Sequence, residues 1–140
     1  MNDNGSQVVL VTGAARRIGA GIIRKLHAQG MNIVLHYNSS IEAANSLVDE
    51  LNNQRESSIT ALQFDLAQTD QLGLFADRVM ACWGRLDVLV NNASTFYPTP
   101  VDQMSLEQWD DLTNVNLKAP LFLCQVFASE LDKRSGNIIN

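Results

Sequence analysis

The chain has 140 residues, is 46% hydrophobic and carries a formal net charge of −5 at pH 7. This length suits one domain with a single hydrophobic core and is too short for two. An acidic chain is poorly suited to nucleic acids, whose binding depends on neutralising phosphates, and to anionic membrane surfaces. We therefore expect a small-molecule ligand and neither a nucleic-acid nor a membrane partner.

Three further features bear on the compartment. No apolar run approaches the ~20 residues of a membrane-spanning helix. The polar start from Met1 to Gln7 lacks the apolar segment of a secretory signal. Cys82 and Cys124 belong to no C-x-x-C pattern, so we expect two reduced, half-buried thiols. The sequence thus favours a cytoplasmic protein, and it offers no ligand pattern for a metal.

Apolar runs alternate along the chain with stretches of helical periodicity. Strands are predicted at 7–12, 32–36, 59–64, 86–90 and 136–140. Between them we predict four helical stretches: one with Ile18, Ile22, Ile23 and Leu26 inward and a stop at Gly30; one capped by Ser40 with Ala43, Ala44, Leu47, Val48 and Leu51 inward; one capped by Asp70 with Leu72, Phe75, Ala76, Val79 and Trp83 inward; and a long stretch to about Leu131. Ser105 and Gln108 fit a capping box at the start of the last stretch, and Pro120 predicts a bend or break within it. Trp109 is interpreted, like Trp83, as a core or interface residue. Strands separated by helices imply an α/β fold with parallel pairing.

Positive charge is concentrated near the start of the chain. From Asn4 to Ile41 there are four basic residues and no acidic residue, although the protein is acidic overall. Arg24 and Lys25 are best explained as solvated residues on the outer face of a helix. Arg16 and Arg17 instead lie in a turn between a strand and a helix, which favours a small anionic ligand.

The turn from Thr12 to Gly19 has the context that a dinucleotide-binding fingerprint needs. Gly13 permits a tight turn, and Gly19 lets the helix approach the strand closely. The N–H groups and the dipole at the helix start favour a pyrophosphate. A cation such as Arg17 opposes that dipole unless an anion is bound, so Arg17 is a candidate for contact with phosphate.

The end of the second strand bears on the choice of cofactor. Enzymes that use NAD place a carboxylate there, which would repel a 2′-phosphate. Here the residues are His36, Tyr37, Asn38, Ser39 and Ser40, with no acid, so the sequence favours NADPH. His36 is equally well explained as a strand-end histidine with satisfied hydrogen bonds.

These motifs together resemble the short-chain dehydrogenase/reductase family. Its T-G-x-x-x-G-x-G pattern is present with Arg17 in place of the middle glycine, and Asp65 follows the third strand. Asn91-Asn92-Ala93-Ser94 resembles the family's N-N-A-G, and the segment 114–119 resembles the helix that carries its catalytic-site Asn. Arg17 and the segment 91–100 are similar to the pteridine-reducing branch. The resemblance covers Val8 to Asn140.

The resemblance implies a Rossmann-like doubly wound parallel sheet with strand order 3-2-1-4-5. It implies that residues 1–140 are the NADP-binding, N-terminal portion of such a domain, truncated before the family's last strands. It also implies NADPH-dependent reduction of pterins or dihydrofolate, with Asn116 as catalytic residue and Arg17, Ser94 and Phe96 at the substrate. The implied cofactor-binding set is Gly13, Arg16, Arg17, Ile18, Gly19, His36, Tyr37, Asn38, Ser39, Ser40, Asp65, Leu66, Asn92, Ala93 and Ser94. Ser39 departs from the pattern, because the pteridine reductases have arginine there. Phe96 would stack on a flat heterocycle; alternatively it packs the loop onto the core.

The family's proton-donating Y-x-x-x-K is not present. Tyr37 and Tyr97 are the two tyrosines, and Ile41 and Val101 stand four residues after them. We therefore expect the N-terminal part of a longer, tetrameric enzyme, inactive by itself and with an unpaired apolar strand at one edge. Two alternatives remain: a reductase of 3-oxoacyl thioesters or other carbonyls, and a non-catalytic NADPH-binding module.

Overall fold

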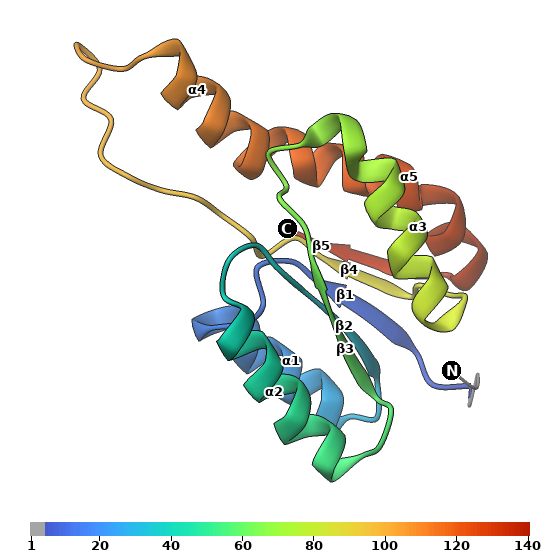
Figure 1. Cartoon of the computed structure of the whole chain (residues 1–140). Helices are drawn as coiled ribbons and strands as arrows, with labels where there is room; N and C mark the ends of the chain where they lie inside the picture. Colours follow the sequence, from blue (N-terminus) through green and yellow to red (C-terminus); the bar gives the residue numbers. More distant parts are fainter. Residues whose placement is uncertain (1–4) are drawn as a thin grey trace.

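A computed structural model describes residues 5–140, so residues 1–4 of the polar start lie outside the described part. The alternation of strands and helices follows the prediction from the sequence (Figure 1). In chain order the elements are β1 (Val8–Val11), α1 (Arg17–Ala28), β2 (Asn32–Tyr37), α2 (Ile41–Gln54), β3 (Ile59–Gln63), the 3-10 turn η1 (Thr69–Gln71), α3 (Leu72–Trp83), β4 (Val88–Val90), α4 (Leu106–Thr113), the π-helical segment η2 (Asn114–Lys118), α5 (Ala119–Arg134) and β5 (Asn137–Ile139).

The five strands form one parallel sheet in the order β3-β2-β1-β4-β5. This confirms the Rossmann-like, doubly wound arrangement. The order reverses at β1, since β2 and β3 continue to one side of it and β4 and β5 to the other. At such a switch point the loops that follow neighbouring strands diverge and leave a crevice at the carboxyl ends.

Successive residues of β1 point to opposite faces of the sheet, as the period of two in a strand requires. Val9 and Val11 pack under α1 and α2, while Val8 and Leu10 pack under α3 and α5. All four residues of β1 are fully buried, which explains the continuous apolar run. Figure 1 shows the two pairs of helices on opposite faces.

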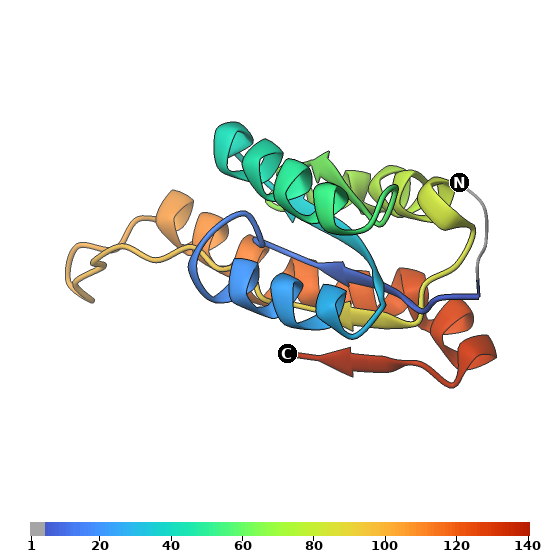
Figure 2. The ribbon, with the colours of Figure 1, turned by 90° about the horizontal axis from the view of Figure 1, so that it is seen from below.

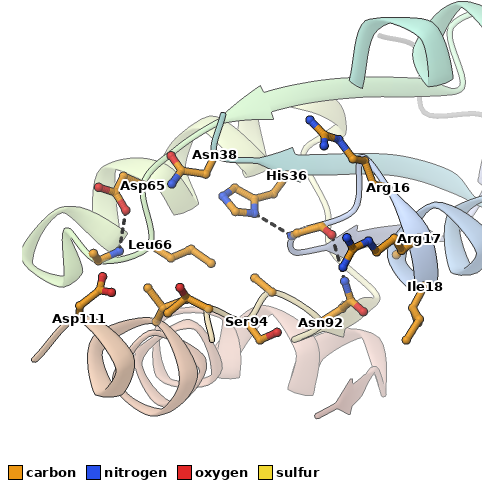
Figure 3. A pocket seen from close by; sticks show the side chains of 16 residues that line it. Arg16, Arg17, Ile18, His36, Asn38, Asp65, Leu66, Asn92, Ser94 and Asp111 are labelled. Carbon is orange, nitrogen blue, oxygen red and sulfur yellow. Dashed lines mark hydrogen bonds between the residues drawn. The ribbon is translucent and has the colours of Figure 1, made fainter. Parts of the chain in front are cut away.

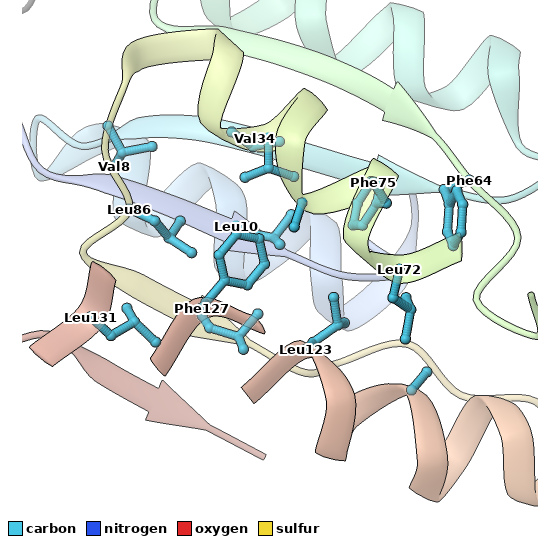
Figure 4. Packing of buried hydrophobic residues seen from close by; sticks show 14 of the residues in the cluster. Val8, Leu10, Val34, Phe64, Leu72, Phe75, Leu86, Leu123, Phe127 and Leu131 are labelled. Atoms are coloured by element: carbon cyan, nitrogen blue, oxygen red, sulfur yellow. The ribbon is translucent and has the colours of Figure 1, made fainter. Parts of the chain in front are cut away.

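The core between the sheet and the α3–α5 pair is filled mainly by aromatic and leucine side chains (Figure 4). The predicted inward face of α3, from Leu72 to Trp83, is confirmed as buried. Phe75 stacks on Phe64 with ring centroids 4.8 Å apart, and Phe127 of α5 is 1% exposed. Burial of each such side chain is worth roughly 1.5–3 kcal/mol.

The chain leaves the body of the sheet after β4. The segment 93–104 has no helix or strand, and Figures 1 and 2 both show it projecting away before it returns through α4. No residue of α4 is buried, and its Trp109 is 56% exposed. Trp109 is therefore not a core residue. The predicted capping box at the start of α4 is confirmed, since Ser105 and Gln108 exchange both hydrogen bonds.

The long helical stretch is interrupted before Pro120 rather than at it. The backbone widens into the π-helical segment η2, where the N–H of Ala119 donates to the carbonyl of Asn114. Proline lacks an N–H and clashes with the carbonyl four residues earlier. The wider turn resolves that conflict and leaves Pro120 in the first turn of α5, where proline is tolerated.

Two predicted caps are corrected by the structure. Asp70 lies inside the 3-10 turn η1, and Gln71 precedes α3. Ser40 stands at the N-cap position of α2, but its side chain accepts no capping hydrogen bond. Within residues 5–140, no helix combines the length and apolar character needed to cross a bilayer.

Candidate dinucleotide-binding site

The turn after β1 is built on two glycines that leave no room for a side chain. Gly13 has a φ of +61°, and a Cβ on it would lie 2.7 Å from the Cα of Ala93. A Cβ on Gly19 would lie 2.6 Å from the Cα of Ala14 and 2.8 Å from the carbonyl oxygen of Gly13. The first glycine therefore lets the turn pass close to the chain after β4, and the second lets α1 start against the turn.

The β4 side of the turn is held by Asn92 and Thr12. The Nδ2 group of Asn92 donates to the carbonyl oxygens of Thr12, at 2.9 Å, and of Gly13, at 3.1 Å. In return, the hydroxyl oxygen of Thr12 accepts from the backbone N–H groups of Asn92 and Ala93, both at 3.0 Å. These bonds join residues about 80 positions apart and fix the turn against the end of β4.

The β2 side of the turn is held by His36, which is 2% exposed. Its Nδ1 accepts from the N–H of Gly13 at 3.0 Å (Figure 3). Its Nε2 lies 3.0 Å from the carbonyl oxygen of Phe64. Burial lowers the pKa of His36 to about 4, against the raising effects of the Phe64 carbonyl and Asp65, while Arg78 lowers it further. Both ring nitrogens are thus engaged within the protein, as the strand-end interpretation expects.

Helix α1 begins beside this turn, and its first turn carries no acidic residue. The first N–H groups of a helix have no partner inside the helix, so they are available to an anion. Arg17 has a φ of +51°, a left-handed conformation that glycine adopts without strain. The arginine thus stands at the position where the family pattern has glycine. Ile18, predicted on the inward face of α1, is instead 74% exposed and faces the crevice.

The chain after β3 forms a second, smaller turn. The carboxylate of Asp65 accepts from the N–H of Ala67 at 3.0 Å, and Leu66 is buried with 4% exposed. Asp65 therefore keeps a defined orientation at the edge of the crevice, close to the end of β2.

The projecting segment is attached to the helices at two points. Asn116 in the π-helical segment donates from Nδ2 to the carbonyl of Thr95, at 2.8 Å, and accepts from its N–H, at 2.9 Å. The hydroxyl of Tyr97 donates to Asp111 at 2.9 Å. Desolvation and the Asp111 carboxylate raise the pKa of Tyr97. Phe96 lies between these two anchored residues and is 87% exposed, so it does not pack the segment onto the core.

These turns enclose a crevice of about 600 Å³ at the carboxyl ends of β1, β2, β3 and β4 (Figure 3). This volume lies within the range of roughly 300–1000 Å³ that is typical of ligand sites. Twelve of the predicted cofactor residues line it: Gly13, Arg16, Arg17, Ile18, Gly19, His36, Asn38, Asp65, Leu66, Asn92, Ala93 and Ser94. The structure does not bring Tyr37, Ser39, Ser40, Phe96 or Asn116 into that lining.

Four lining residues were missed by the sequence analysis: Ala67, Thr95, Asp111 and Val115. Thr95 stands inside the segment that carries the resemblance, and Ala67 directly follows Leu66. Asp111 and Val115 are four residues apart and share one helix face, which was the signal available for them. Among residues 5–140 there is no cluster of three or more His, Cys, Asp or Glu side chains suited to a metal ion.

A parallel sheet with a glycine turn and a helix start at its switch point defines the nucleotide-binding class of α/β folds. Residues 7–140 match the family described as short chain dehydrogenase, and the chain belongs to that family.

Individual relatives are similar over most of this chain. It is 38% identical to pteridine reductase 1 of Leishmania tarentolae, over 89% of this chain and 54% of the relative. It is also 38% identical to the 3-oxoacyl-[acyl-carrier-protein] reductase FabG of Staphylococcus aureus strain Mu50, over 94% of this chain and 53% of the relative. A metagenomic short-chain oxidoreductase, solved in complex with NADP, superposes with a TM-score of 0.87 at 39% identity and covers 96% of this chain and 60% of its own. The chain spans about half the length of the curated relatives it matches.

Proposed function

We propose that the crevice binds NADPH. The observation that carries this proposal is the pairing of the Gly13–Gly19 turn with a β2 end that has no carboxylate. The start of α1, with Arg16 and Arg17, would hold the phosphates, and Asn38 is the residue of the β2 end that lines the crevice. Tyr37, Ser39 and Ser40 stay in the proposal only as neighbours of Asn38. The similar solved structure, which contains NADP, supports the same cofactor.

The rest of the cofactor fits the remaining lining. Asp65 and Leu66 would hold the adenine end, and Asn92, Ala93 and Ser94 would border the nicotinamide end. When bound, the nicotinamide supplies a hydride. His36 and Asn92 keep the phosphate turn in place, and Asn116 keeps Thr95 at the wall of the crevice. In this proposal Asn116 acts by holding the loop that borders the reacting ring.

We further propose that the substrate is a pterin, a dihydropterin or dihydrofolate. Arg17 lies at the crevice with a cation that suits a substrate carbonyl as well as a phosphate. Phe96 follows the lining residue Thr95 and has an exposed ring that can stack on a flat heterocycle. Ser94, two residues before Phe96, adds a hydroxyl to the lining of the crevice. The similarity to pteridine reductase 1 supports this substrate class.

Reduction of 3-oxoacyl thioesters is the second candidate, because the similarity to FabG is equal in identity. The stacking ring of Phe96 distinguishes the candidates, since a small carbonyl needs no platform. For the whole enzyme we propose a tetramer, supported by exposed apolar side chains on the outer face of α5, Leu121, Phe122 and Val126. The thiols of Cys82 and Cys124 are free and half-buried, which fits a reducing compartment such as the cytoplasm.

The cofactor proposal is tested by titrating the chain with NADPH and NADH and following nicotinamide fluorescence. We expect NADPH to bind at least tenfold more tightly. Equal affinity for the two would contradict the argument from the β2 end, and binding of neither would overturn the site itself.

The substrate proposal is tested by adding dihydrobiopterin or an acetoacetyl thioester to the chain with bound NADP⁺. We expect the pterin to bind and Phe96→Ala to weaken it several-fold. Leu106→Ala is the matched control, because Leu106 is 83% exposed but lies outside the crevice. Binding of the thioester alone would favour the second candidate. Binding of neither, with NADP⁺ bound, would support a module that binds only the cofactor.

A further inference from the structure

The chain has two histidines, and both are buried, but only one of them touches the phosphate turn. His27 lies near the end of α1, with Nε2 2.7 Å from the hydroxyl of Ser58. His36 lies at the end of β2 and contacts Gly13. His36 is therefore the buried histidine that contacts the proposed phosphate-binding turn.

The two partners of His36 fix the protonation of its ring. A backbone N–H can only donate, so Nδ1 must present a lone pair to Gly13. A carbonyl can only accept, so Nε2 must carry the hydrogen toward Phe64. The ring is thus neutral and in the Nε2–H form, which agrees with its pKa of about 4. The edge of Phe75 closes the ring's surroundings, with centroids 5.4 Å apart.

The residue also holds a second group of the turn through its backbone. The carbonyl oxygen of His36 accepts from the N–H of Ala14 at 2.9 Å. Two successive N–H groups of the turn, from Gly13 and Ala14, are therefore directed at one residue of β2. They are not available to a phosphate, which must use N–H groups further along, in the rest of the turn and at the start of α1. The direction of these remaining N–H groups depends on the position in which His36 holds the turn.

We propose that His36 is a positioning residue: its neutral ring holds the phosphate turn by accepting the Gly13 N–H, without contacting the dinucleotide through a ring nitrogen. The inference rests on the proposed NADPH site. Asn92 holds the same turn from the β4 side through the carbonyl of Gly13. Figure 3 shows the two side chains reaching the turn from different sides. Gly13 is thus bound on its N–H by β2 and on its carbonyl by β4.

Two substitutions separate the two hydrogen bonds of the ring. His36→Asn places an amide oxygen close to the Nδ1 position, so the acceptor for Gly13 is kept while the donor to Phe64 is lost. His36→Gln places an amide N–H₂ close to the Nε2 position, so the donor to Phe64 is kept while the acceptor for Gly13 is lost. Both substitutions place an amide side chain in the same buried site, so any loss of stability from burying an amide is common to the two variants. The matched controls are His27→Asn and His27→Gln.

Affinity for NADP⁺ is measured by calorimetry on the 140-residue chain and its variants at pH 7. We expect His36→Gln to weaken binding at least tenfold and His36→Asn to stay within about threefold of the parent. The His27 variants are expected to lower the urea midpoint without changing affinity. The proposal is overturned if His36→Gln binds as tightly as the parent, or if both His36 variants lose affinity equally.

A spectroscopic measurement on the unsubstituted chain needs no variant to fold. In ¹⁵N-labelled protein we expect the His36 ring in the Nε2–H form, with a coupling across the hydrogen bond between the Gly13 amide nitrogen and Nδ1. The opposite tautomer, or a Gly13 amide without that coupling, would overturn the proposal. This measurement needs no ligand, so it tests the role of His36 even if the chain does not bind NADP⁺. A failure to bind NADP⁺ would contradict the proposed cofactor and not the hydrogen bond from Gly13 to His36.

Discussion

Gly19→Ala provides a direct test of how the phosphate turn is built. The new Cβ would lie 2.6 Å from the Cα of Ala14, about 0.8 Å closer than ordinary contact at 3.4 Å. The nearest atoms include backbone of Ala14 and Gly13, which cannot rotate away. Overpacking of this kind costs about 1–3 kcal/mol, whereas alanine in place of glycine in a helix gains about 0.5–1 kcal/mol. We therefore expect a net loss of roughly 1–2 kcal/mol in the free energy of unfolding.

Gly21→Ala is the matched control, two residues further along the same helix. A Cβ on Gly21 meets no atom within 4 Å, so the substitution adds the higher helix propensity of alanine without any steric cost. We expect this variant to be more stable than the parent by about 0.5–1 kcal/mol. Urea unfolding gives both values, and NADPH fluorescence gives the affinity, which should fall at least tenfold in Gly19→Ala alone. If Gly19→Ala matches the parent in stability and affinity, or if the two variants shift together, the close-packed turn is refuted.

Three further predictions concern the loop, acid stability and the core. Asn116→Ala removes both hydrogen bonds to Thr95, so we expect a loss of about 1 kcal/mol and faster amide exchange at Thr95; unchanged exchange there would contradict the anchor. His36 becomes protonated below about pH 6.5 in the unfolded chain, but only below about pH 4 in the folded chain, where its pKa is lowered. The contribution of His36 to stability should therefore fall by about 3 kcal/mol across that window and stay constant below it, and this component should vanish from the urea profile of His36→Asn. Phe127→Ala should cost about 3–5 kcal/mol, whereas Phe122→Ala, at a side chain 37% exposed, should cost under ~1.5 kcal/mol in the same assay.

The order of strands and helices was predictable because each element carries its own pattern. The run from Val8 to Val11 is apolar at every position, and α3 has its buried residues at helical spacing. Local propensity was less informative at the helix starts. Asp70 has the chemistry of a cap but lies within a 3-10 turn. Pro120 predicted a break at its own position, whereas the backbone adjusts one turn earlier.

The candidate site was predictable where a turn has special backbone needs. The positions of Gly13 and Gly19 follow from the turn that the chain must make there, whereas Asp65 and Asn92 were predicted from the family resemblance of the segments after their strands. Asp111 and Val115 were missed although they are four residues apart in a predicted helical stretch, because that spacing does not show which face of the helix meets the crevice. Ile18 fits the helical period of a core residue, and only the family resemblance placed it at the cofactor, where the structure finds it exposed and lining the crevice.

The hydrogen bonds around Gly13 also bear on when the site exists during folding. They connect residues 23 positions apart, to His36, and 79 positions apart, to Asn92. Contacts of such long sequence separation form only after the chain has paid the entropy of closing the intervening loops, so parallel sheets assemble slowly. We therefore expect the phosphate turn to be completed late, after β1 has paired with β2 and β4. A ligand that recognises the finished turn then binds only the native state. At a free concentration one hundred times its dissociation constant, it adds about 2.7 kcal/mol to the free energy of unfolding of the whole sheet.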